Sequence, residues 1–295
     1  MADFSKVALQ GHSAGLKIGT TPIQFATNVG LKPTVTYNEW DQYLGSTRYP
    51  SGCTRFPLKI DNAGPLEITA ATHATAKILL ATHFSGSAYT LPTDVNGTDN
   101  TVDIIVNDGQ GTFTYADCWI PVLEISGEDE APIAFNLTAL GGGTRTAAGS
   151  VGAPTCATPY LHSDLTVTII DGTSTVHPAS TKLTFDQGVG DGKFRQSLTR
   201  THLDAMVYKA TVELSLPWNA DNATFIEQCL TNAENQMTIT LTQTDGSIAF
   251  NFGGIRFQGD GIPDIPGNGD IMATLIGEAF TTTAGAFLTV TVTDS

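Results

Sequence analysis

Hydrophobic and polar residues alternate along most of the chain, in short runs that turn residues separate. Residues 102–107 and 239–242, for example, carry an apolar side chain at every second position. This period is typical of a β-strand with one buried face. Only residues 74–83 and 222–233 space their apolar side chains as a helix does, with Thr72 and either Asn219 or Asp221 as N-caps. The pattern predicts a mainly β protein with two short helices.

The strand pattern occurs twice, in the same order. Residues 102–109 form an alternating run that ends in Asp-Gly, and a second alternating run follows at 112–115; residues 239–246 and 249–252 repeat this arrangement. Each copy therefore predicts a hairpin with an Asp-Gly turn. Four further matches keep the same order: 16–20 with 167–173, 34–37 with 182–185, 56–60 with 210–216, and 135–141 with 271–277. Six matches in one order indicate an internal duplication.

The duplication predicts two tandem domains. Residues 1–145 and 158–295 are expected to form a β-sandwich or partly open barrel each, with one short helix per domain. Residues 146–157, rich in Gly, Ala and Ser, are expected to be the linker. Neither copy alternates strands with helices, which disfavours a Rossmann-like sheet.

Composition and charge restrict the function. Charged residues are only 15% of the chain, too few for a disordered protein. Fourteen Lys and Arg against 29 Asp and Glu give a net charge of −15, which disfavours a protein that grips DNA phosphates with clustered cations. No apolar run approaches the ~20 residues that a spanning helix needs. The N-terminus does not resemble a secretory signal, so we expect an unprocessed cytoplasmic product.

The sequence predicts no catalytic residue, cofactor or metal. It contains no GxSxG, P-loop or HExxH motif. The four cysteines lie far apart and the six histidines are scattered, which disfavours zinc. A loop from Asp260 to Asp270 holds carboxylates among glycines, as some calcium loops do. Its spacing departs from that of an EF-hand, so an ordinary loop between strands is favoured and calcium stays an open alternative.

Two long polar loops carry aromatic and basic residues in an otherwise acidic chain. They follow corresponding strands of the two copies, and aromatic residues and Arg are enriched where proteins meet. We therefore expect an inter-subunit contact arm, with a solvated hairpin and a ligand-binding loop as alternatives. Its candidate residues are Trp40, Tyr43, Arg48, Tyr49 and Arg55 in the first loop and Phe194, Arg195 and Arg200 in the second.

In this organisation the chain resembles the major tail tube proteins of siphophages, in the two-domain form with a duplicated tube domain. The resemblance rests on the hairpin near residues 16–23, the long extension after Thr36, the helix in the middle of each copy, and the two Asp-Gly hairpins. It implies a structural virion protein rather than an enzyme. This protein would form stacked rings of three chains with pseudo-sixfold symmetry.

The resemblance also implies partners and a location. Inner sheets would join around an acidic channel, through which DNA passes without specific binding. The arm would be mobile in a free subunit and become ordered against the neighbouring ring. Besides other copies of itself, the chain would contact the tape measure, tail terminator and distal tail proteins, within the virion.

A different class of protein remains as an alternative. A duplicated β-sandwich could be a carbohydrate-binding or adhesin module, in which Trp40, Tyr43 and Tyr49 stack on sugar rings. A glycosidase is disfavoured, because nothing in the sequence singles out a pair of carboxylates.

Overall fold

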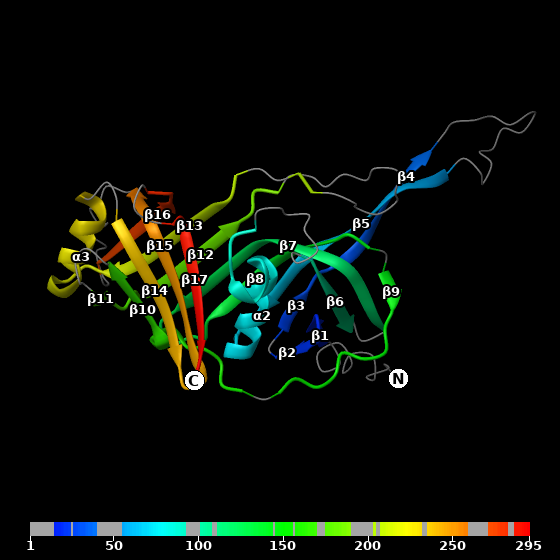
Figure 1. Ribbon diagram of the computed structural model, residues 1–295, viewed down its shortest axis with the longest axis horizontal. Helices are drawn as coiled ribbons and strands as arrows, with labels where there is room; N and C mark the ends of the chain where they lie inside the picture. The colour runs from blue at the N-terminus through cyan, green and yellow to red at the C-terminus, as the bar shows by residue number, and fades with distance from the viewer. Residues whose placement is uncertain are drawn as a thin grey trace, which may run out of the picture.

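Strands make up most of the residues that the computed structural model of the chain describes. It describes residues 15–24, 26–39, 55–92, 101–107, 111–143, 145–155, 157–169, 175–189, 203–204, 207–231, 235–258, 271–282 and 286–295. Within these residues the protein is mainly β with two α-helices, one in each half, as the alternation predicted. Figure 1 shows the second half at one end of the molecule and the β4–β5 ribbon at the other, with β7 crossing between them.

In the described part of the first half there are nine strands. They are β1 (Gly15–Ile18), β2 (Thr21–Ile23), β3 (Ala26–Val29), β4 (Lys32–Glu39), β5 (Arg55–Ile68), β6 (Val102–Asn107), β7 (Thr112–Glu128), β8 (Ala134–Gly141) and β9 (Arg145–Ala147). Helix α2 (His73–His83) and the 3-10 turn η1 (Gly86–Ala88) lie between β5 and β6.

The residues described in the second half form eight strands. They are β10 (Leu165–Ile169), β11 (Thr175–Val176), β12 (Ser180–Asp186), β13 (Lys209–Pro217), β14 (Asn235–Gln243), β15 (Gly246–Gln258), β16 (Met272–Ala279) and β17 (Leu288–Asp294). The 3-10 turn η3 (His162–Asp164) precedes β10, and helix α3 (Ala220–Thr231) follows β13.

The two halves repeat one pattern of antiparallel strand pairing. In the first half the pairs are β1–β2, β1–β6, β4–β5, β5–β8, β6–β7, β7–β8 and β7–β9. In the second half the corresponding pairs are β10–β11, β10–β14, β12–β13, β13–β16, β14–β15, β15–β16 and β15–β17. The hydrogen bonding therefore follows the repeat seen in the sequence. The division into two domains at 145 and 158 stays a prediction.

The longest strand of each half belongs to two layers. The first part of β7 pairs with β6 and β9, and its second part pairs with β8. The pairing register shifts between Trp119 and Val122, and Asp117 has a φ of 50°. Such irregularities bend a strand, so β7 passes from one layer into the other. Strands β5, β7 and β15 are therefore longer than the short strands that the sequence predicted.

One layer continues from the first half into the second. Strand β12 pairs with the second part of β7, which links β4, β5, β8 and β7 to β12, β13, β16 and the end of β15. We call this layer the joined sheet. One of its faces packs on the hydrophobic core, where Leu66, Leu137, Leu123, Leu183 and Leu214 are buried. The opposite face, the polar face, carries the alternate residues of each strand.

Both predicted helices are confirmed, with small differences at their ends. Helix α2 begins at His73, one residue before the predicted start, and Thr72 caps it by accepting the Thr75 N–H at 3.2 Å. Helix α3 begins at Ala220, two residues before its predicted start, and the Asn222 N–H donates to Asn219 Oδ1 at 2.9 Å. Of the two predicted caps, Asn219 is thus the one in use.

Part of the predicted linker is ordered as a strand. Strand β9 pairs with β7, and the Arg145 guanidinium lies 3.3 Å above the centre of the Phe113 ring. Farther along, Val151 and Tyr160 are both buried. Most of the small residues between Ala147 and Ala157 are exposed, and the role of this segment as a linker stays a prediction.

Candidate assembly interface

The joint between β7 and β12 is the best-defined contact between the two halves. Its antiparallel register runs from Ser180 opposite Glu128 to Asp186 opposite Val122. On the core side, Leu183 lies opposite Ile125 and Phe185 opposite Leu123, with all four side chains buried. The joint therefore combines main-chain hydrogen bonds with apolar packing. These are also the two components through which strands from different chains associate.

An ion pair crosses the polar side of this joint. Lys182 Nζ of β12 lies 2.8 Å from Glu124 Oε2 of β7. The hydrogen bond that Lys182 donates to Glu124 raises the pKa of Lys182, and the negative charges of Glu124 and Glu213 act in the same direction, while partial desolvation acts against them. Because the pair is largely solvent-exposed, it adds charge complementarity to the joint more than it adds stability.

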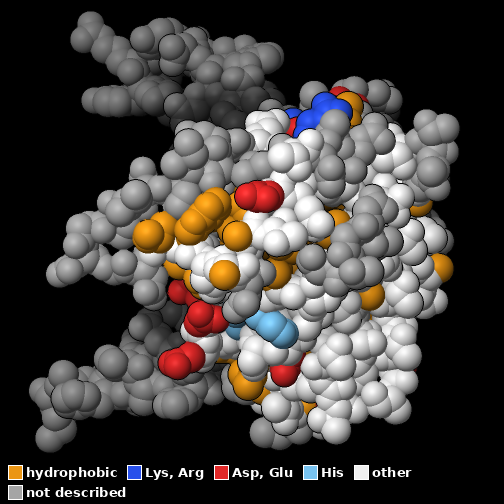
Figure 2. Space-filling view, turned by 90° about the vertical axis from the view of Figure 1, so that its left-hand side faces the viewer, with side chains coloured by type: hydrophobic (Ala, Val, Ile, Leu, Met, Phe, Trp, Pro, Cys, Tyr) orange, Lys and Arg blue, Asp and Glu red, His pale blue; other side chains and the backbone are white. Residues whose placement is uncertain are grey.

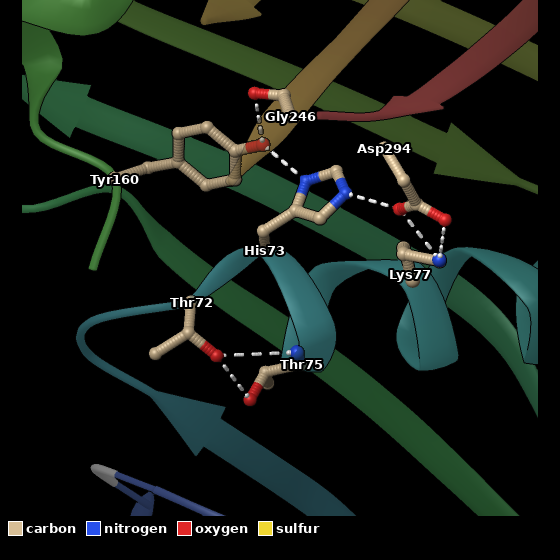
Figure 3. Close-up of polar contacts among 7 residues, drawn as sticks. All are labelled: Thr72, His73, Thr75, Lys77, Tyr160, Gly246 and Asp294. Carbon is tan, nitrogen blue, oxygen red and sulfur yellow. Dashed lines mark hydrogen bonds and ion pairs between the residues drawn. The ribbon is translucent and has the colours of Figure 1, made fainter. Parts of the chain in front are cut away.

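A polar cluster ties helix α2 to the end of the second half (Figure 3). His73 Nδ1 lies 2.6 Å from the Tyr160 hydroxyl, and His73 Nε2 lies 2.9 Å from Asp294 Oδ1. Lys77 Nζ donates to both carboxylate oxygens of Asp294 at 2.7 Å. The hydrogen bonds from Lys77 and His73 hold the pKa of Asp294 below its usual range. The cluster therefore fixes the C-terminal strand against the first half.

A second histidine binds the other end of α2 to the second half. His83 is fully buried, with Nδ1 2.9 Å from Ile120 O and Nε2 2.9 Å from the Tyr208 hydroxyl. Since a carbonyl can only accept, Nδ1 donates to Ile120 O and Nε2 accepts the Tyr208 O–H. Burial lowers the pKa of His83 to about 4, although the backbone hydrogen bond acts in the opposite direction. His83 is thus a neutral part of the contact.

Two edges of the joined sheet lie at opposite ends of its strand order. At one end, β3 and β4 pair with β5 on one side, and within the described residues no strand pairs on the other side. At the other end, the last residues of β15 pair with β16. In the repeat, β4 corresponds to β12, and the end of β15 corresponds to the second part of β7. Strand β12 and the second part of β7 are the strands that form the joint inside the chain. Within the described residues, the chain therefore carries at these two edges the strands that correspond to the two sides of the joint.

The end of the molecule shown in Figure 2 carries scattered acidic side chains. On the end of the molecule that faces the viewer in Figure 2, Asp and Glu side chains appear at several points, whereas coloured Lys and Arg side chains gather at the upper edge. This distribution is consistent with the net charge of −15.

Most of the candidate arm residues lie outside the described residues. This holds for Trp40, Tyr43, Arg48, Tyr49, Phe194, Arg195 and Arg200. Arg55 is the first residue of β5, where its backbone pairs with Glu39, and its side chain is not described. The arm therefore stays a prediction.

The possible calcium loop from Asp260 to Asp270 also lies outside the described residues. Within the part of the chain that is described, no group of three or more His, Cys, Asp or Glu side chains is arranged to hold a metal ion. No helix in that part is long and apolar enough to cross a membrane.

A comparison with protein-family models matches residues 30–284 to the phage tail tube protein family. The chain belongs to the phage tail tube protein family. The match spans both halves, including the β7–β12 joint and both free edges, and the family is one of structural components of the phage tail. A comparison with curated protein sequences finds no match.

Sequence reasoning missed the contacts between the two halves. His73 and His83 were interpreted as scattered histidines, solvated or packed, yet each forms hydrogen bonds with the other half. One signal was available, since both residues lie at the ends of the same predicted helix. Their partners Asp294 and Tyr208 come from remote parts of the chain, and local patterns do not indicate them.

Proposed function

We propose that the chain is the structural subunit of a phage tail tube, and that subunits associate through the two free edges of the joined sheet. The observation that carries this proposal is the β7–β12 joint inside the chain. In this proposal, the β3–β4 edge of one chain pairs with the end of β15 in the next chain, in the way that β12 pairs with β7 within one chain. Because the two edges differ, the contact is heterologous, and such contacts close into a ring when their rotation permits.

The internal repeat supports rings of three chains. If each contact between chains resembles the joint within a chain, three chains place six similar units around one axis. The polar face of the joined sheet then lines a channel for DNA ejection, since its other face is covered by the core. The chain would act in the virion as a non-enzymatic component, after synthesis in the host cytoplasm, and meet the tape measure, tail terminator and distal tail proteins at the ends of the tube.

Lys32 is a test position for the edge contact. It is exposed on β4, the strand corresponding to β12, whose Lys182 pairs with Glu124 across the joint inside the chain. A charge reversal, Lys32→Glu, should therefore weaken assembly with a neighbouring acidic chain. Lys17→Glu is the matched control, because it makes the same charge change on β1, a strand paired on both sides.

The experiment compares the three proteins by light scattering and negative-stain electron microscopy over a range of concentrations. We expect rings or tubes from the wild type and from Lys17→Glu, and fewer from Lys32→Glu, with unchanged circular dichroism. Wild-type protein that stays monomeric at high concentration would refute the proposed function. Equal assembly of Lys32→Glu and Lys17→Glu would remove the β4 edge from the interface.

The arm is proposed to join neighbouring rings. Ordering its backbone costs about 1–2 kcal/mol per residue, which contacts made on assembly must offset. Deletion of residues 40–52 should leave a folded protein that no longer forms tubes. Normal tubes from this variant would show that the arm is dispensable, and an unfolded product would place it in the core of the first half.

A further inference from the structure

The polar face of the joined sheet carries charges of both signs. In the described strands its acidic residues are Asp61, Glu67, Glu124, Glu128, Asp186, Glu213 and Glu278. Its basic residues are Lys32, Lys59, Lys182, Lys209 and Arg256. The acidic excess is thus small, and this face is nearly balanced although the whole chain is strongly acidic.

Three of the five basic residues lie directly opposite an acidic residue of the neighbouring strand. The strand register sets three of them directly opposite a carboxylate: Lys182 opposite Glu213, Lys209 opposite Asp186, and Arg256 opposite Glu278. Residues directly opposite each other in antiparallel strands point to the same face, with Cβ atoms about 5 Å apart. Each of these three cations therefore lies directly across the strand pair from a carboxylate on the same face.

Contacts within the sheet strengthen this arrangement. Lys182 has a second carboxylate beside it, because Glu124 Oε2 lies 2.8 Å from its Nζ, and the two acids raise its pKa. Lys59 Nζ lies 3.8 Å from Asp61 Oδ2 on the same strand. Lys32 differs, since its register partner is Ala63, and it lies on the free edge where the proposed neighbour would bind.

We propose that these cross-strand carboxylates neutralise the cations of the polar face, so that the face does not retain a duplex DNA that moves along it. This inference rests on the proposed function, in which the polar face lines the channel. A duplex binds a protein surface mainly by pairing its phosphates with cations and releasing counterions. A cation that is already paired with a fixed carboxylate contributes little to the binding of phosphates. The cations can then support the sheet and its joints without adding to DNA affinity.

The test removes the carboxylates while keeping shape. In Glu124→Gln/Glu213→Gln/Glu278→Gln, the charges beside Lys182 and Arg256 are lost and side-chain size is preserved. The matched control, Glu130→Gln/Glu227→Gln/Asp245→Asn, makes the same net charge change at exposed positions outside the polar face. Binding of a labelled duplex DNA to each full-length protein, in its soluble form, is measured by fluorescence anisotropy against salt concentration.

We expect no binding by the wild type or the control, and salt-dependent binding by the polar-face variant. Two unmasked cations correspond to a loss of affinity of about tenfold between roughly 50 and 200 mM salt. The single variant Glu278→Gln, which removes only the carboxylate opposite Arg256, should show about half that logarithmic slope and guards against misfolding of the triple variant.

Equal DNA binding by the polar-face variant and the control would overturn the inference, because net charge alone would then explain the result. Binding by the wild type, with the carboxylates in place, would overturn it as well. The measurement uses soluble chains, so its outcome is independent of whether the wild type forms rings. A failure of this inference is therefore distinguishable from a failure of the proposed function.

Discussion

Acidification should destabilise the protein through His83, the buried neutral histidine of α2. Its two ring nitrogens are already used, one as a donor to Ile120 O and the other as an acceptor from the Tyr208 hydroxyl. A second ring proton would place a charge in the core and meet the hydroxyl proton of Tyr208. Burial therefore lowers the pKa of His83 to about 4. The contact between the halves should weaken when this residue is forced to protonate.

The size of the effect follows from the difference between the two pKa values. An unfolded histidine titrates near its ordinary pKa of about 6.5, so between that pH and about 4 the unfolded state binds more protons than the folded state. The stabilisation is therefore complete above about pH 7 and decreases as the pH falls. The expected loss is about 2 kcal/mol at pH 5 and about 3 kcal/mol at pH 4.

Urea unfolding of the wild type and of His83→Gln, followed by circular dichroism from about pH 7.5 to 4.5, isolates this contribution. The glutamine amide has one donor and one acceptor group but does not titrate. We expect the wild type to lose about 2 kcal/mol more than the variant on going to pH 5. All other titrating groups are common to both proteins and cancel in the comparison. Parallel pH profiles would refute the assignment of the acid sensitivity to His83.

Two further predictions concern single positions. Gly246 has a φ of +148°, and a Cβ there would lie 2.3 Å from Thr293 O, so Gly246→Ala should lower the free energy of unfolding by roughly 1–3 kcal/mol. Gly149→Ala, where nothing lies within 4 Å, is the control, and equal urea midpoints would contradict the prediction. Burial raises the pKa of the Cys229 thiol, so mass spectrometry should find it unlabelled by a thiol reagent near pH 8 until the protein unfolds.

Local patterns predicted the secondary structure well, because the period of two survives wherever one face of a strand is buried. Strands β6, β14 and β12 follow the alternation closely. The alternation fails in β7 between Cys118 and Pro121, where four consecutive residues are buried as the strand changes layer. Nothing in the local alternation indicates this bend, and the pattern at 112–115 predicts only a short strand where the structure has the long β7.

The assembly surface could be predicted only in part. The duplication was visible in the sequence, and it indicated that two similar units exist. Which edges meet depends on non-local pairing, such as β12 with β7, and on partners like His73 and Asp294, which are 221 positions apart. No periodicity within a short segment encodes such choices. The role of Trp40 and the other arm residues stays a prediction.

The position of β12 in the chain has a consequence for synthesis. Strand β7 ends at Glu128, and β12, which covers its edge, begins at Ser180. Translation adds roughly 5–20 residues per second, so the β7 edge of a nascent chain waits several seconds for its own partner. During that interval it can pair with an exposed strand of another nascent chain on the same messenger. Slow translation between these strands should therefore increase misassembly, and crowded polysomes should be the place where it begins.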